Sequence, residues 1–86
     1  MERPILHYKK QFEKELKEFL LQLGHNIRNH RKRLNLTQEE LHIKTGICQK
    51  TISLIENGHM NVTIKQLARI ASVFNVTLIE LLKKYR

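Results

Sequence analysis

The sequence predicts an all-α protein. Apolar residues recur at intervals of three and four along most of the 86-residue chain, which is the spacing of one helical face. Helix-start signals, in which a threonine precedes a glutamate or glutamine by three residues, occur at Thr37, Thr63 and Thr77. No stretch shows the alternating pattern of a half-buried strand. A chain of this length has room for one small helical core only.

The first predicted element is an amphipathic helix in the N-terminal part of the chain. Its apolar face consists of Phe12, Leu16, Phe19, Leu20, Leu23 and Ile27. We expect residues 1–22 to form a helical extension and residues 23–86 to form the domain proper. Gly24 lies near this boundary, and an exposed glycine costs a helix only about 1 kcal/mol relative to alanine. The sequence therefore leaves open whether the helix continues through Gly24 or kinks there.

Five helices are expected in the domain itself. The first ends near Leu34, and the second begins after Thr37 with Glu40 three residues further on. Gly46 separates the second helix from a third. The fourth and fifth helices follow the remaining two threonine signals. Their apolar faces consist of Ile64, Leu67, Ile70, Ala71 and Phe74, and of Leu78, Leu81 and Leu82.

The most informative stretch runs from Gln38 to Asn57. Gly46 is suited to the left-handed conformation that ends a helix sharply, and the link of residues 46–48 has the length of a tight helix-helix turn. The segments TQEEL, TGI and TISLIENG make this stretch resemble the Cro/C1-type (xenobiotic-response-element) DNA-binding domains of phage repressors and bacterial regulators. The resemblance extends over residues 23–82. It implies a five-helix lambda-repressor-like domain, here with an extra N-terminal amphipathic helix.

Charge and composition limit the possible partners. The chain has 16 Lys and Arg against 8 Asp and Glu, a net charge of +8, and residues 1–22 account for only five of the basic and four of the acidic side chains. So basic a domain favours a polyanion, although an RNA-binding protein would have the same balance. One cysteine excludes an internal disulfide, and no apolar run has the length of a membrane span. We expect a cytoplasmic protein.

Catalysis and cofactor binding are not expected. The five histidines and single cysteine lack the spacing of a metal site, and no phosphate-binding loop or nucleophile motif is present. The sequence therefore predicts a protein without enzymatic activity, cofactor or metal.

The resemblance implies that the helix at residues 49–57 lies in the major groove of DNA. The base-contacting set carried over from the family is Gln49, Lys50, Ser53 and Leu54. An amide such as that of Gln49 pairs with adenine, and an ammonium such as that of Lys50 donates to guanine. Leu54 has only a thymine methyl to contact, and a partner surface is the alternative for this residue.

Other positions match the phosphate contacts and the structural ion pair of the family. The expected phosphate-contacting set is Thr37, Gln38, Asn57 and Asn61, to which Arg28, Lys32 and Lys44 are added for their charge. Arg31 and Glu56 match a paired arginine and glutamate that join the first helix to the recognition helix. This pair is expected to stabilise the fold and not to read bases.

Three residues depart from the family pattern. His42 stands where a small residue is usual, so either the two motif helices are splayed or the imidazole lies at their edge. Ile43 is apolar at a position expected to be exposed, which suggests contact with the N-terminal helix. Cys48 stands where a serine or threonine commonly caps the recognition helix. We interpret it as a weak cap, with a redox-active thiolate as the alternative.

The function predicted is sequence-specific binding of double-stranded DNA by a homodimeric transcriptional regulator, a repressor or autoregulator of a palindromic operator. Two surfaces are candidates for the dimer contact. One consists of Val76, Leu78, Ile79 and Leu82, and the other of Phe12, Leu16 and Phe19. Within this class, residues 61–64 resemble the controller proteins of restriction-modification systems. The alternative is an antitoxin or interaction module whose N-terminal helix binds a partner protein.

Overall fold

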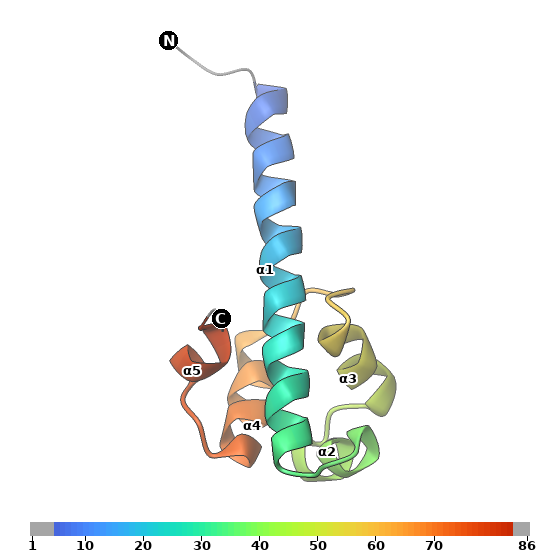
Figure 1. Cartoon of the computed structure of the whole chain (residues 1–86). Coiled ribbons are helices and arrows are strands. Elements are labelled where there is room, and N and C mark those ends of the chain that lie inside the picture. Colours follow the sequence, from blue (N-terminus) through green and yellow to red (C-terminus); the bar gives the residue numbers. More distant parts are fainter. Residues whose placement is uncertain (1–4, 84–86) are drawn as a thin grey trace.

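The described part of the chain, residues 5–83, contains five helices and no strand in the computed structural model (Figure 1). The helices are α1 (Ile5–Arg33), α2 (Gln38–Thr45), α3 (Gln49–Glu56), α4 (Ile64–Phe74) and α5 (Leu78–Leu82). The predicted all-α class is confirmed. Residues 1–4 and 84–86, at the outer ends of the two predicted segments, lie outside the described residues. No helix between residues 5 and 83 combines the length and the apolar character needed to cross a membrane.

The extension and the first domain helix are one element. Helix α1 runs for 29 residues without a break at Gly24, so the question left open at this residue is resolved in favour of a continuous helix. The expectation that Gly24 is exposed was wrong, because its backbone lies against the C-terminal end of α3. A methyl group at Gly24 would lie 2.6 Å from the carbonyl oxygen of Glu56. Glycine is required here by the close approach of two helices.

Replacing Gly24 by alanine is expected to lower the free energy of unfolding by about 1 to 3 kcal/mol, the usual cost of overpacking. Alanine would gain up to about 1 kcal/mol in helix propensity, but the atoms it meets belong to the backbone of α3 and have little freedom to move. Urea denaturation followed by circular dichroism measures the difference. The neighbouring exposed residue supplies a control, because His25→Ala should change stability by no more than about 0.5 kcal/mol. A stabilised Gly24→Ala protein would contradict the close packing.

One apolar core joins the helices below the N-terminal half of α1. Its larger members are Leu23, Ile27, Leu41, Ile47, Ile52, Ile55, Leu67, Ile70, Phe74 and Leu81. Full burial of such a side chain contributes about 1.5 to 3 kcal/mol. Helix α1 packs against α3, α4 and α5, whereas α2 packs against α3 and α4. The core therefore holds α3 between α1 and α2.

Threonine caps begin three of the helices, as predicted. Thr37 and Thr63 form complete capping boxes with Glu40 and Gln66. The prediction of the same box at Thr77 was only half right. The Thr77 hydroxyl accepts a bond from the backbone N–H of Glu80, whereas the Glu80 carboxylate lies 3.4 Å from Lys83 Nζ.

Asn26 joins α1 to α5 through hydrogen bonds. Its side chain is fully buried, and its amide nitrogen donates to the carbonyl oxygens of Leu81 and Lys83 at the end of α5. Its amide oxygen accepts a hydrogen bond of 2.9 Å from Gln22. Carbonyl groups at a helix end have no partner within the helix, so Asn26 satisfies α5 where the helix itself cannot.

His30 is a buried titratable group in the same helix. Its ring stacks on Phe74 with the ring centres 5.7 Å apart. Burial lowers the pKa of His30 from its ordinary value of 6.5, and the charge of Arg33 lowers it further, while Glu80 acts in the opposite direction. The folded protein therefore favours the neutral imidazole.

The stability of the protein is expected to fall as the pH is lowered from about 7.5 to about 5.5. Because the pKa of His30 is lower in the folded state, the unfolded chain takes up the proton first and is favoured by acid. Glu40 and Glu56 also have lowered pKa values, but they start from 4.5 and act at lower pH. The free energy of unfolding measured across this range should be flatter for His30→Gln. An equally steep profile for this variant would assign the effect to another group.

The N-terminal part of α1, residues 5–22, projects beyond the other helices and is called the stalk below (Figure 1). Phe12 and Phe19 of the stalk are exposed to 64% and 47%. The suggested contact between this helix and Ile43 is absent from the described residues, because Ile43 lies on α2 and is 72% exposed. The stalk therefore does not fold back over this part of its own domain.

Candidate nucleic-acid interface

The turn between α2 and α3 is fixed by local hydrogen bonds. Gly46 has a φ of +76°, as predicted, and its N–H donates to the carbonyl oxygen of His42. The hydroxyl of Thr45 bonds to the Leu41 carbonyl oxygen and accepts from the N–H of Ile47. The imidazole of His42 contacts the Ile47 carbonyl oxygen at 2.7 Å. Of the two alternatives for His42, the structure has the ring at the edge of the turn, where it helps to hold the link.

The first turn of α3 begins without a side-chain cap. Cys48 occupies the cap position, is exposed, and makes no capping hydrogen bond. This matches its interpretation as a weak cap. The N–H groups in the first turn of α3 therefore receive no hydrogen bond from the side chain of the cap residue.

The predicted base-contacting residues lie together on the outer face of α3. Gln49 and Lys50 are exposed, whereas Ser53 and Leu54 are half-buried. Together with Gln38 of α2, these four residues line one shallow depression of about 490 Å³. The amide, ammonium and hydroxyl groups there can donate to or accept from base edges, and Leu54 adds an apolar contact.

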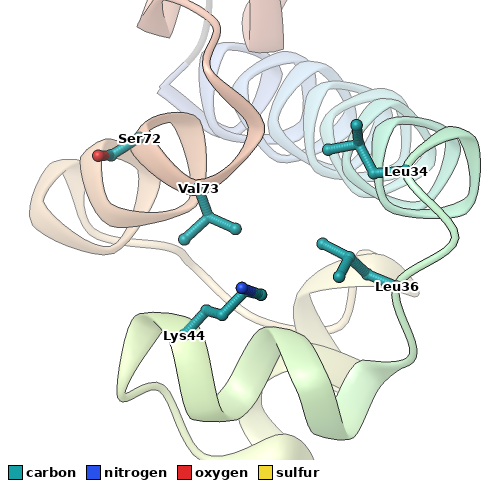
Figure 2. Close-up of a pocket in the computed structure, with 5 residues that line it drawn as sticks. All are labelled: Leu34, Leu36, Lys44, Ser72 and Val73. Atoms are coloured by element: carbon teal, nitrogen blue, oxygen red, sulfur yellow. The ribbon is translucent and has the colours of Figure 1, made fainter.

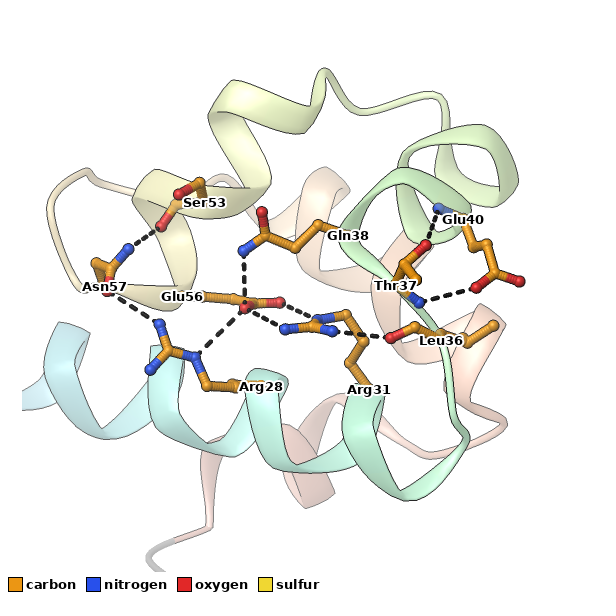
Figure 3. A network of polar contacts seen from close by, with 9 residues as sticks. All are labelled: Arg28, Arg31, Leu36, Thr37, Gln38, Glu40, Ser53, Glu56 and Asn57. Atoms are coloured by element: carbon orange, nitrogen blue, oxygen red, sulfur yellow. Dashed lines mark hydrogen bonds and ion pairs between the residues drawn. The ribbon is translucent and has the colours of Figure 1, made fainter.

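The C-terminal end of α3 is anchored through the buried carboxylate of Glu56 (Figure 3). Arg31 donates to both carboxylate oxygens, at 2.7 and 3.0 Å, and Gln38 donates at 3.2 Å. Arg28 lies 3.5 Å from the same group and also donates to the side chain of Asn57 at 2.9 Å. The ion pair of Arg31 and Glu56 is thus the centre of a larger network that joins α1, α2 and α3.

The protonation of Glu56 follows from this network. Burial alone would raise the pKa of the carboxyl group, but hydrogen bonds from Arg31 and Gln38, the charge of Arg31 and the bond from Arg28 outweigh it. The net pKa is lowered, so Glu56 is a carboxylate at neutral pH. A paired charge at this point holds the recognition helix against α1.

The predicted phosphate contacts are not all in one place. Thr37 and Gln38 lie at the start of α2 beside the depression, but the hydroxyl of Thr37 is already bonded to the N–H of Glu40. Arg28 and Asn57 are engaged with each other and with α3, since Asn57 also donates to the carbonyl oxygen of Ser53.

The other three residues of this set lie elsewhere. Lys32 is exposed near the end of α1. Asn61 lies in the loop before α4 and lines a separate groove with stalk residues such as Leu16. Lys44 lines a groove between α2 and α4 with Leu34, Leu36, Ser72 and Val73 (Figure 2). Asn61 and Lys44 therefore do not share the depression that contains Gln49.

Two residues that hold α1 against other helices were not identified from the sequence. Gly24 allows α1 to approach the end of α3, and Asn26 holds α5 against α1. Asn26 had a detectable signal, since it falls on the apolar face between Leu23 and Ile27, where a polar side chain is expected to need a buried partner. Between residues 5 and 83 no cluster of three His, Cys, Asp or Glu side chains is arranged to hold a metal ion.

Comparison with known proteins agrees with this geometry. The helix-turn-helix family pattern matches residues 27–81. An HTH-type transcriptional regulator of Archaeoglobus fulgidus is 41% identical over 49 residues, which cover 57% of this chain and 69% of that protein. A second regulator of the same organism is 38% identical over 55 residues, covering 64% of this chain and 79% of that protein.

Solved structures show the same fold. The restriction-modification controller protein C.AhdI from Aeromonas hydrophila has a TM-score of 0.70 and 26% identity, over 72% of this chain and 94% of its own. The DNA-binding domain of BldD has a TM-score of 0.70 and 28% identity, over 78% of this chain and 97% of its own. The chain therefore belongs to the Cro/C1-type helix-turn-helix family of DNA-binding transcriptional regulators.

Proposed function

We propose that this regulator reads a palindromic operator in double-stranded DNA by placing the first half of α3 in the major groove. The observation that carries the proposal is that α3 combines open polar side chains with a firmly held C-terminal end. Gln49, Lys50 and Ser53 line an open depression, while Glu56, the last residue of α3, is buried in the Arg31 network. A rigidly held helix with exposed donors and acceptors is what base readout requires.

Within this proposal, Gln49 and Lys50 read bases and the start of α2 binds phosphate. The amide of Gln49 suits adenine and the ammonium of Lys50 suits guanine. Thr37 and Gln38 stand at the N-terminus of α2, where backbone N–H groups and the helix dipole favour an anion. Lys32, Lys44 and Asn61 act as outer contacts to the backbone, and Arg28 and Asn57 reach phosphate from the edge of the Glu56 network.

The proposed assembly is a homodimer that works in the cytoplasm by binding alone, without catalysis. Two-fold symmetry would place two recognition helices on half-sites about 34 Å apart and explain a palindromic operator. Similarity to a restriction-modification controller supports the role of a repressor or autoregulator. The alternative of an antitoxin or protein-capture module is not favoured, since the relatives are transcriptional regulators.

Selection of bound sequences from a pool of random duplexes tests the proposal. The expected result is one enriched palindrome whose half-sites lie about 10 base pairs apart, centre to centre. Enrichment of no sequence, with equal binding to all duplexes, would contradict sequence-specific recognition.

Replacing Gln49 or Lys50 by alanine should weaken binding to the selected operator by about 1 to 3 kcal/mol and relax the preference at one base pair. Both side chains are exposed, so thermal stability should remain close to that of the wild type. Binding to single-position operator variants, measured by fluorescence anisotropy, gives the preference at each position. Lys65→Ala, an exposed lysine on α4, is the matched control and should leave every preference intact. Equal weakening on all sequences would show that the residue contacts only the DNA backbone.

A further inference from the structure

The stalk has an aromatic ridge that the domain does not cover. Tyr8, Phe12 and Phe19 are exposed to 56%, 64% and 47%. At about 100° of rotation per residue, these three side chains fall within about 40° of one another around α1. Large apolar side chains grouped in this way are uncommon on the surface of a monomer and mark an interaction site.

The ridge lies on the side of α1 that faces α5, and not on the side that faces α3. It is in line with Asn26, whose amide binds the carbonyl oxygens at the end of α5. Gly24 and Arg28, which contact α3, lie roughly 160° around the helix from Asn26. Figure 1 accordingly shows α5 and α3 on opposite sides of α1. A partner bound to the ridge would leave the recognition helix free for DNA.

Helix α5 adds a second apolar area at the foot of the ridge. Val76 and Leu78 of the expected C-terminal surface pack partly against the core of their own domain. Ile79 and Leu82 remain exposed, to 69% and 39%, and are spaced i, i+3 on one side of α5. The two surfaces that the sequence offered as alternatives therefore lie toward the same side of α1, because the ridge is in line with Asn26, which binds the end of α5.

We propose that the ridge and the exposed side of α5 form one self-association surface, which binds the same surface of a second copy of this chain. This inference rests on the proposed function, because a single recognition helix covers too few base pairs for specific binding and a second copy supplies the other half-site. It adds the stalk to the contact and makes the stalk, with its aromatic side chains, the larger part.

Charge favours a second copy over another kind of partner. From Tyr8 to Gln22 the stalk has four lysines and three glutamates, so it is nearly neutral although the chain as a whole has a net charge of +8. Two such stalks do not repel each other, and side chains of both signs are present to form pairs at the rim. An acidic partner would be drawn to the basic domain and not to the stalk.

The available area also suits a dimer. With about 200 Å² for each aromatic side chain, the ridge exposes roughly 330 Å² in each copy. Two ridges therefore contribute roughly 650 Å² before Ile79, Leu82 and the flanking methylene groups are added, which approaches the roughly 1,200 Å² of a small specific interface.

Sedimentation equilibrium of the full chain at tens of micromolar tests the proposal with three variants. The wild type should be a dimer. Phe12→Glu with Phe19→Glu, and separately Ile79→Asp, should raise the dimer dissociation constant by at least about 100-fold. Ile43→Asp changes an isoleucine of similar exposure on α2, outside the surface, and should leave the dimer unchanged. A wild-type monomer, or a dimer that survives the double substitution, would overturn the proposal.

A DNA measurement separates this proposal from the proposed function. The double variant should keep its sequence preference on a single half-site but lose the preference for two correctly spaced half-sites. All substituted side chains lie outside the core, so the double variant should remain folded. The melting temperature of the monomeric variant checks this. A wild-type dimer with no sequence preference would contradict the proposed function and leave the dimer surface supported.

Discussion

Replacing Arg31 by alanine is expected to lower the free energy of unfolding by about 3 to 5 kcal/mol, the typical cost of removing one partner of a buried ion pair. The side chain of Glu56 is fully buried and that of Arg31 is 12% exposed. Without Arg31, the carboxylate retains only Gln38 and a distant Arg28, and the carbonyl oxygen of Leu36 loses its donor. Urea denaturation followed by circular dichroism measures the loss.

A control variant and the pH dependence test whether the loss of stability comes from the ion pair. Lys32→Ala, an exposed neighbour in α1, should change stability by no more than about 0.5 kcal/mol. The pKa of Glu56 is lowered in the folded state, so its contribution is present above the unfolded value of 4.5 and is lost as the pH falls. The difference between wild type and Arg31→Ala should therefore narrow in acid. A difference that does not vary with pH would assign the cost to lost packing.

Affinity for the operator is expected to fall by about 10³ to 10⁵ between about 50 and 200 mM salt, the result for roughly six to ten phosphate contacts. The net charge of +8 favours release of counterions from DNA. Anisotropy titrations at several salt concentrations give the slope of log affinity against log salt.

Single substitutions show how much each lysine contributes to the slope of log affinity against log salt. Removing a lysine that contacts phosphate, such as Lys32, should reduce the slope by about 1 and weaken binding to all sequences alike. Lys65→Ala again serves as the control, with an unchanged slope expected. A flat salt response of the wild type would show that phosphate contacts contribute little.

Features set by local chemistry were predictable from the sequence. The threonine caps, the left-handed Gly46 and the helical faces follow from preferences that act within a few residues. The assignment of Arg31 and Glu56 came from resemblance to a family, since nothing in the spacing of these two residues shows that they meet. The half-formed box at Thr77 marks the limit of such rules, because Lys83 lies close enough to Glu80 to attract its carboxylate.

Features that depend on distant segments were not predictable. Nothing local distinguishes Gly24 from an exposed glycine, because the atoms that crowd it belong to residues 55 and 56. The place of Asn26 on the apolar face indicates that it needs a buried partner, but nothing local shows that this partner lies more than fifty residues away, at the end of α5. The grouping of Gln38 with Gln49 and the separation of Lys44 from both follow from how α2 packs against α3 and α4. Residue identity indicates the chemistry of these side chains, whereas helix packing decides which of them act together.

The unbroken backbone of α1 fixes the rotational phase between the stalk and the domain. Inserting one residue between Phe19 and Leu23 would turn the aromatic ridge by about 100° relative to α5, while changing the length of the stalk by only about 1.5 Å. Inserting seven residues would add about 10 Å yet return the ridge to within about 20° of its present direction. The number of residues between the ridge and Asn26, more than their identity, thus determines the direction in which the ridge faces while α3 faces DNA.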